Sequence, residues 1–329
     1  MSCVFDSLRR RRPGRQYNQS GPASKASATL GDGRTRRLEG VWGWPVVVLI
    51  VLGMVINSGA RADMVLQTPQ VRIVHDPGLK SRAAQIAAMS PAIIRSLEHQ
   101  LGLPFDLQPT VVPAPDRAAF RRLGGRAWLT AFAVPRRQLV VLDLSRLDQR
   151  AGDLHATLKH EFAHLLLHQA IDSQRLPRWL DEGVAQWASD GLSEYLPAVQ
   201  RSLLPQAASA GRLFYLDELV VQFPANHQGR QLAYEQSRSF VNYMVRRFGE
   251  GALPLLLQSL AAGAAPWEAF EEALGAGLDT TEDEWRGGLH SPGSWMASLA
   301  GHVYGLLFFL AAVATIGAYL RFRHRKRHY

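Results

Sequence analysis

The sequence contains almost no cysteine. Among 329 residues the single cysteine is Cys3, close to the N-terminus. One cysteine excludes an intrachain disulfide, and the body of the chain offers no thiolate as a zinc ligand. A metal site in this chain must therefore be built from histidine, aspartate and glutamate.

The body of the chain also lacks a surplus of positive charge. The net charge is +9, but residues 1–40 carry nine Lys/Arg against three Asp/Glu, and residues 321–329 carry five Lys/Arg and no acid. Residues 41–320 therefore sum to −2. Because the basic character belongs to the two ends, we predict no nucleic-acid partner. The alternative is a DNA-associated membrane protein that uses its arginine-rich N-terminus.

Apolar side chains are scarce in residues 1–40, which we predict to be a basic, disordered lead on the cytoplasmic side. A start codon assigned too early would give the same pattern. Residues 41–56 are nearly all apolar, but they are short for a membrane span, which needs about 20 residues. Ala60-Arg61-Ala62 follows with the form of a cleavage site. We predict that 41–62 is a signal peptide or, alternatively, an uncleaved signal anchor.

Charged residues are absent from 303–320, and a strongly basic tail follows at 321–329. This pattern predicts a linker and transmembrane helix over 293–320 and a cytoplasmic tail over 321–329, with a buried core helix as the alternative. The expected protein lies in the cell membrane, of the bacterial inner-membrane type, with a single C-terminal pass. Its body, residues 63–292, would then be extracytoplasmic, in the periplasm.

The body is predicted to be α+β. Strands are expected at 71–74 and 109–113, and a hairpin at 128–134 and 138–142. Helical spacing of apolar residues predicts helices at 81–101, 153–170, 177–190, 216–223, 231–248, 253–262 and 267–274. The strands therefore lie in the first half, and the second half is expected to be helical.

The helix at 153–170 contains the motif H-E-x-x-H, with His160, Glu161 and His164. Histidines four residues apart lie on one helix face, so both imidazoles can reach one zinc ion. Glu161 would lie beside the ion and accept a proton from an activated water. The alternative is a helix with two surface histidines that flank a glutamate. The same helix contains Asp153 and Lys159, which argues against an intramembrane metalloprotease.

A third ligand is available in Glu182, eighteen residues after His164. A loop between the two helices lets the second fold back beside the first, so that a carboxylate can complete a His₂Glu site. The metzincin pattern fails, because Leu167 and Ala170 stand where glycine and histidine are required. His168 is expected to be a surface or packing histidine.

The motif at 160–164, followed by L-P-R-W-L-D-E-G-V-A at 176–185, resembles the gluzincin metallopeptidases, and most of all the bacterial peptidase MA-like domains. The resemblance covers about residues 70–275 and implies a zincin-like fold within 63–292. That fold has a small mixed sheet with a hairpin packed on the H-E-x-x-H helix and a mostly helical second half. It also implies one Zn²⁺ held by His160, His164 and Glu182, with Glu161 as general base.

The resemblance extends to Tyr234, which lies in a Y-x-x-S helix like that of the family. A phenol near the metal could donate a hydrogen bond to the oxyanion of a tetrahedral intermediate. The alternative is an aromatic side chain that only packs. His227 is a weaker candidate for the same role.

These features together predict a membrane-anchored zinc metallopeptidase that acts on a peptide or protein substrate. An endopeptidase is favoured over an aminopeptidase, because no signature for the N-terminal amine of a substrate is visible. Residues 138–142 are expected to pair with an extended substrate as an added strand. The alternative function is a non-proteolytic, zinc-binding envelope scaffold or assembly protein on the same fold.

Overall fold

The computed structural model describes residues 64–147, 153–189 and 202–289, together with Thr315. The predictions for the basic lead, for the signal segment and for 303–320 fall outside these ranges, apart from Thr315. The chain divides into two compact units, Met1–Arg175 with Ala188–Tyr195, and Leu176–Trp187 with Leu196–Tyr329. The strands that the structure describes all belong to the first unit.

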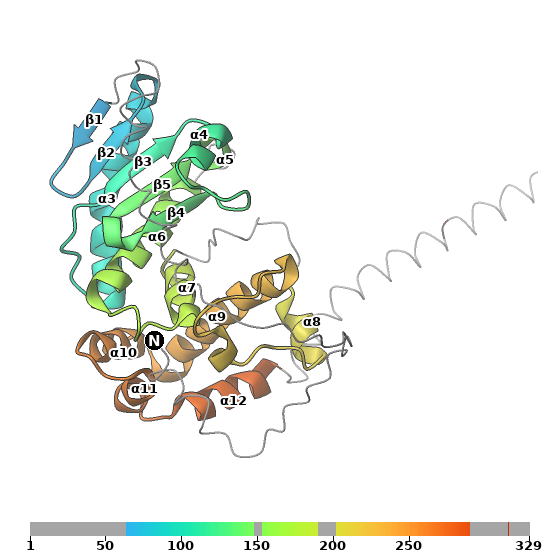
Figure 1. Ribbon diagram of the computed structural model, residues 1–329. Coiled ribbons are helices and arrows are strands. Elements are labelled where there is room, and N and C mark those ends of the chain that lie inside the picture. The colour runs from blue at the N-terminus through green and yellow to red at the C-terminus, as the bar shows by residue number, and fades with distance from the viewer. Residues whose placement is uncertain (1–63, 148–152, 190–201, 290–314, 316–329) are drawn as a thin grey trace, which may run out of the picture. The chain divides into compact units, whose positions relative to one another are not determined.

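A mixed five-stranded sheet forms the centre of the first unit (Figure 1). The strands are β1 (Met64–Gln67), β2 (Arg72–His75), β3 (Thr110–Ala114), β4 (Ala131–Val134) and β5 (Leu139–Asp143), in the order β1-β2-β3-β5-β4. β2, β3 and β5 run parallel, whereas β1 and β4 are antiparallel to their neighbours. β5 is apolar from Leu139 to Leu142 and is paired on both sides, as is usual for a buried interior strand.

Helices complete the first unit. They are α3 (Lys80–Leu101), α4 (Arg117–Arg122), α5 (Leu144–Leu147) and α6 (Asp153–Ala170), with short 3₁₀ turns η1 (Pro77–Leu79) and η2 (Pro135–Arg137). α3 ends at Gly102, whose φ of 64° closes the helix in the left-handed conformation that glycine adopts without strain. α6 packs against α3 and against β4. Buried Leu158 and Phe162 anchor α6 in this core.

The second unit is helical. It contains α7 (Arg178–Ala188, whose last residue clusters with the first unit), α8 (Leu204–Ser209), η3 (Leu216–Leu219), α9 (His227–Phe248), α10 (Ala252–Ala261), α11 (Pro266–Leu274) and α12 (Leu278–Leu289). Its core is aromatic: Phe240 of α9 packs edge-on against Trp179 at 5.3 Å and against Trp285 at 5.6 Å between ring centroids. These contacts join α7, α9 and α12, since the three rings come from those helices.

The predicted α+β, zincin-like arrangement is confirmed in the described residues, including the hairpin and the helix at 153–170. Several details differ. The strand β1 and the helices α4, α5, α8 and α12 were not predicted, and the expected helix at 216–223 is only the short turn η3. α9 begins at His227, four residues earlier than expected, because the Asn226 side chain accepts from the Gly229 backbone N–H and caps the helix.

One part of the predicted fold class was wrong, namely the C-terminal transmembrane helix. Among the residues that the structure describes, no helix is both long enough and apolar enough to cross a membrane. The longest helices there, α3 and α9, have 22 residues each, but both carry charged side chains along their length. The segment predicted to span, 303–320, lies outside the described residues except for Thr315.

Candidate metal site

The two histidines of α6 face one another. Their Nε2 atoms are 3.2 Å apart, and the rings meet edge to face with centroids 4.8 Å apart. His160 is 1% exposed and His164 is 7% exposed. Two buried imidazole nitrogens that converge in this way suit a shared cation, since imidazole is a ligand that zinc prefers.

Burial on α6 is more extensive than the sequence suggested. Apolar Leu158 and Phe162 are fully buried, but so is Glu161, and Lys159 is only 5% exposed. A helix that is buried on nearly all sides through its middle turns cannot present a simple pair of surface histidines. That alternative is therefore excluded by the structure.

Glu182 lies on α7 and is 1% exposed. Within the second unit its Oε1 atom makes two polar contacts. Nη2 of Arg178 forms an ion pair with it at 2.5 Å, and the Tyr234 hydroxyl donates a hydrogen bond to it at 3.4 Å. Tyr234 is 4% exposed, and its ring packs edge-on against Phe223. Arg178 was not among the residues predicted for the site, although its spacing of four residues from Glu182 is visible in the sequence.

α7 is held closely against α9. A Cβ at Gly183 would lie 2.6 Å from the Ser237 carbonyl oxygen, so only glycine permits this approach. The Gln186 side-chain amide donates to the Tyr234 carbonyl oxygen at 3.2 Å and ties the same two helices together. Residues next to Glu182 in the sequence therefore fix its backbone relative to Tyr234.

One possible ligand atom from each of His160, His164 and Glu182 lies within 4.8 Å of the other two. Two imidazole nitrogens and one carboxylate oxygen are the donors of a His₂Glu zinc site, which leaves a fourth position for water. Three buried donors of this chemistry fit a single zinc ion. The structure thus brings together the three residues that the sequence predicted as metal ligands.

The other candidate histidines lie elsewhere. His168 lines a surface pocket of about 340 Å³ with Pro135, Arg136 and Gln169. His168 is half-buried there. His227 is exposed and begins α9, so its position as a helix-start residue gives no support to the weaker role considered for it.

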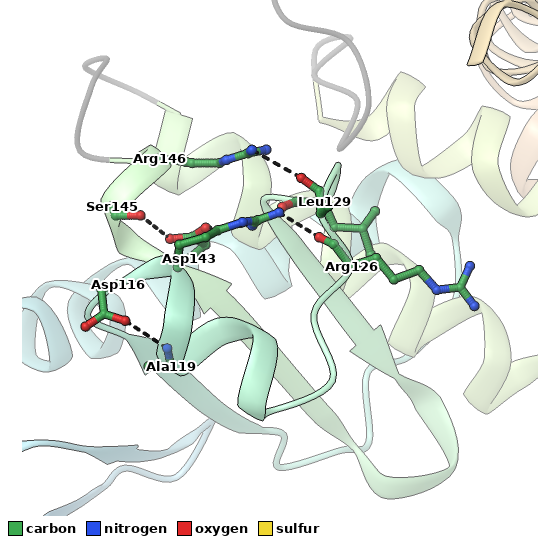
Figure 2. A network of polar contacts seen from close by, with 9 residues as sticks. Asp116, Ala119, Arg126, Leu129, Asp143, Ser145 and Arg146 are labelled. Carbon is green, nitrogen blue, oxygen red and sulfur yellow. Dashed lines mark hydrogen bonds and ion pairs between the residues drawn. The ribbon is translucent and has the colours of Figure 1, made fainter. Parts of the chain in front are cut away.

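A polar network fixes the loop that leads into β4 (Figure 2). Asp143 is fully buried, and its Oδ2 atom accepts a hydrogen bond from Nη1 of Arg117 at 2.8 Å. Arg117 also donates to the backbone oxygens of Leu129 and Arg126 at 2.8 and 2.7 Å. Arg117, paired with buried Asp143, therefore holds two carbonyl groups just before the strand begins.

The strand order changes the expected place of substrate pairing. Substrate pairing was expected at 138–142, but β5 is paired with β3 on one side and with β4 on the other. β4 lies at the end of the sheet, beside α6. Among the described strands near α6, β4 is therefore the one with an open edge.

Comparison with known proteins places the chain in a family. Residues 126–291, which are half of the chain, match the Peptidase MA superfamily. A search of curated proteins found no match.

Several solved structures match this chain at low similarity. An M1 zinc metallopeptidase from Deinococcus radiodurans is 17% identical, with a TM-score of 0.40, and the match covers 68% of this chain and 50% of that one. Legionella pneumophila aminopeptidase A is 15% identical, with a TM-score of 0.41, and the match covers 69% and 28%. Yeast LTA4 hydrolase is 10% identical, with a TM-score of 0.41, and the match covers 68% and 35%. The chain thus spans half or less of the length of these three structures.

The family match and the buried ligand triad agree with the gluzincin-like class and the single zinc ion that the H-E-x-x-H motif predicted. The chain belongs to the Peptidase MA superfamily.

Proposed function

We propose that this chain is a zinc-dependent peptidase in which His160, His164 and Glu182 hold one zinc ion. The observation that carries the proposal is the convergence of three buried donors within 4.8 Å. When bound at such a site, zinc supplies Lewis acidity that activates a water molecule and polarises the scissile carbonyl. Every other step belongs to side chains of the protein.

Glu161 is the proposed general base. It lies between the two histidine ligands in the sequence and is fully buried. In this role its carboxylate takes a proton from the attacking water and passes it to the leaving amine.

Tyr234 is the proposed donor to the oxyanion. Its hydroxyl lies 3.4 Å from Oε1 of Glu182, which puts a phenol beside the proposed ligand. A phenol in this position can donate to the negative oxygen that develops as water attacks the carbonyl. Packing against Phe223 holds the ring in place for that purpose.

β4 is the proposed binding strand for an extended substrate. The Asp143 N–H donates to the Thr130 carbonyl at 2.8 Å, and Ala131 is paired with Leu142. In an antiparallel ladder the bonded positions alternate, so Ala131 and Ala133 direct their backbone N–H and C=O groups to the open edge. A peptide can add to that edge by main-chain hydrogen bonds alone.

Addition of a strand favours endopeptidase action. Main-chain pairing does not depend on a free terminus of the substrate. The strand β4 itself consists of alanine, phenylalanine and valine. An aminopeptidase needs an acidic group to bind the free amine of its substrate, and β4 supplies none. We therefore propose cleavage within extended peptide segments.

The experiment compares the wild-type chain with Glu161→Gln, loaded with one equivalent of zinc, on casein and on a peptide library. The proposal expects hydrolysis by the wild type and at least a hundredfold loss in the variant, since general base catalysis contributes about 10²–10⁴ in rate. A wild-type chain that binds zinc but cleaves nothing would favour the non-proteolytic scaffold. Equal rates of hydrolysis by both proteins would show that Glu161 is not the general base.

We also propose that the domain works outside the cytoplasm. The support is the apolar run 41–56 followed by Ala60-Arg61-Ala62, which has the form of a signal peptide. N-terminal sequencing of the protein isolated from cells should begin at Asp63. An intact N-terminus on protein recovered from the cytoplasm would contradict this location.

A further inference from the structure

The first turn of α7 carries a positive charge where a helix least favours one. Arg178 is the first residue of α7 and pairs with Glu182 one turn later. The N-terminus of a helix carries a partial positive charge, and a pair four residues apart is more favourable when the acid comes first. The order here is the reverse, so helix stability does not account for this ion pair.

The pair joins an exposed side chain to a buried one. The Arg178 side chain is 44% exposed, whereas that of Glu182 is 2% exposed, and Nη2 lies 2.5 Å from Oε1. The second carboxylate near Arg178, that of Asp181, is farther away at 3.9 Å. The guanidinium group therefore reaches inward to one specific oxygen of Glu182.

Aromatic contacts fix the guanidinium in this position. It lies over the Phe223 ring at 5.9 Å, and Phe223 packs edge-on against Tyr234 at 5.1 Å. The Tyr234 hydroxyl then returns to Oε1 of Glu182 at 3.4 Å. The four side chains form a closed ring within the second unit, and two donors meet at a single carboxylate oxygen.

We propose that Arg178 is a positioning residue for the metal ligand Glu182, an inference that rests on the proposed zinc site. By holding Oε1, Arg178 limits rotation of the carboxylate, so that Glu182 would present its oxygens to the ion in a fixed orientation. Partners that hydrogen-bond to a metal ligand in this way fix its orientation and raise metal affinity.

Arg178 also balances charge before the ion arrives. A carboxylate that is almost fully buried is costly without a cation, and the guanidinium supplies one through a charge-assisted hydrogen bond. Glu182 is thus held in its binding orientation in the metal-free protein, which removes part of the ordering cost of zinc binding.

The test measures the zinc dissociation constant of the full chain by competition with a chromophoric chelator. Arg178→Met removes the charge and the donors, and we expect it to weaken zinc binding about 10–100-fold. Arg178→Lys keeps the charge and should recover part of the loss. Arg247→Met is the matched control, because Arg247 pairs with Glu284 on the surface of the same unit, and it should bind zinc like the wild type.

A second readout separates positioning from a general loss of structure. Circular dichroism of the metal-free variants establishes that they are folded, and the visible absorption of the cobalt-loaded protein reports the geometry around the ion. We expect a changed cobalt spectrum in Arg178→Met and an unchanged one in Arg247→Met. If Arg178→Met does not fold, Arg178→Gln takes its place with the same expectation.

The outcomes distinguish this inference from the proposed function. If the wild type binds one zinc ion and folded Arg178→Met, or Arg178→Gln in its place, binds it equally tightly, the inference fails and the zinc site stands. If the wild type binds no zinc, the proposed function fails, and the positioning role fails with it.

Discussion

The hydroxyl of Tyr234 donates to Oε1 of Glu182 across 3.4 Å, so a residue that the sequence marked as a possible oxyanion donor touches the proposed third ligand. The contact joins α9 to α7 within the second unit. It places the phenol beside the proposed third ligand, while the ring packs on Phe223.

Tyr234→Phe removes this hydroxyl and keeps the ring. We expect kcat for peptide hydrolysis to fall about 10²–10³-fold, as when one oxyanion donor is removed, while the protein keeps its zinc. Steady-state kinetics with parallel metal analysis is the measurement. An unchanged kcat would assign Tyr234 to packing alone.

Gly183→Ala should destabilise the fold through the contact between α7 and α9. The new methyl group would lie 2.6 Å from the Ser237 carbonyl oxygen and 2.8 Å from Cγ2 of Val241. We expect a loss of about 1–3 kcal/mol in the free energy of unfolding, which is typical of overpacking. Thermal unfolding checks it, with Gly251→Ala as control, because a Cβ at Gly251 meets nothing within 4 Å. Equal melting temperatures for Gly183→Ala and the wild type would show that α7 and α9 do not approach this closely at Gly183.

Arg117→Met should loosen the loop before β4. The substitution leaves the buried Asp143 carboxylate without its guanidinium partner and releases the carbonyls of Leu129 and Arg126. We expect a destabilisation of about 3 kcal/mol, as for other buried pairs that lose one member. Urea unfolding measures the change, and hydrogen exchange should show faster exchange at 126–130. The double variant with Asp143→Leu should recover stability, and no recovery would mean that the pair is not the cause.

Ala133→Pro tests the open edge of β4. Proline removes a backbone N–H that points away from β5, so the ladder within the sheet is kept. We expect KM to rise about 5–10-fold with little change in kcat, because one main-chain hydrogen bond to the substrate is lost. Ala133→Val keeps the N–H and serves as control. If KM rises equally in both variants, strand addition is not how the substrate binds.

Sequence patterns identified those parts of the site that are local in the chain. His160, Glu161 and His164 lie within two turns of one helix, so their spacing alone predicts their common face. The bounds of α6 were also predicted, because its apolar residues recur with helical period.

Contacts between segments that are distant in the chain were harder to predict from the sequence. The role of β4 depends on strand order, and nothing local in 128–142 indicates that the second arm of the hairpin, β5, also pairs with β3. The Arg117–Asp143 pair spans 26 residues and becomes visible only when α4 meets the end of β5. Arg178 is the exception, because a spacing of four residues from Glu182 could have revealed it.

Zinc content is the most direct test of the central claim. Metal analysis of the purified full chain should find about one zinc ion per chain in the wild type and in Glu161→Gln, because a single His₂Glu set binds one ion. His160→Ala and Glu182→Ala should each abolish stoichiometric zinc. Zinc that stays stoichiometric in both alanine variants, or a wild type that binds none, would contradict the account.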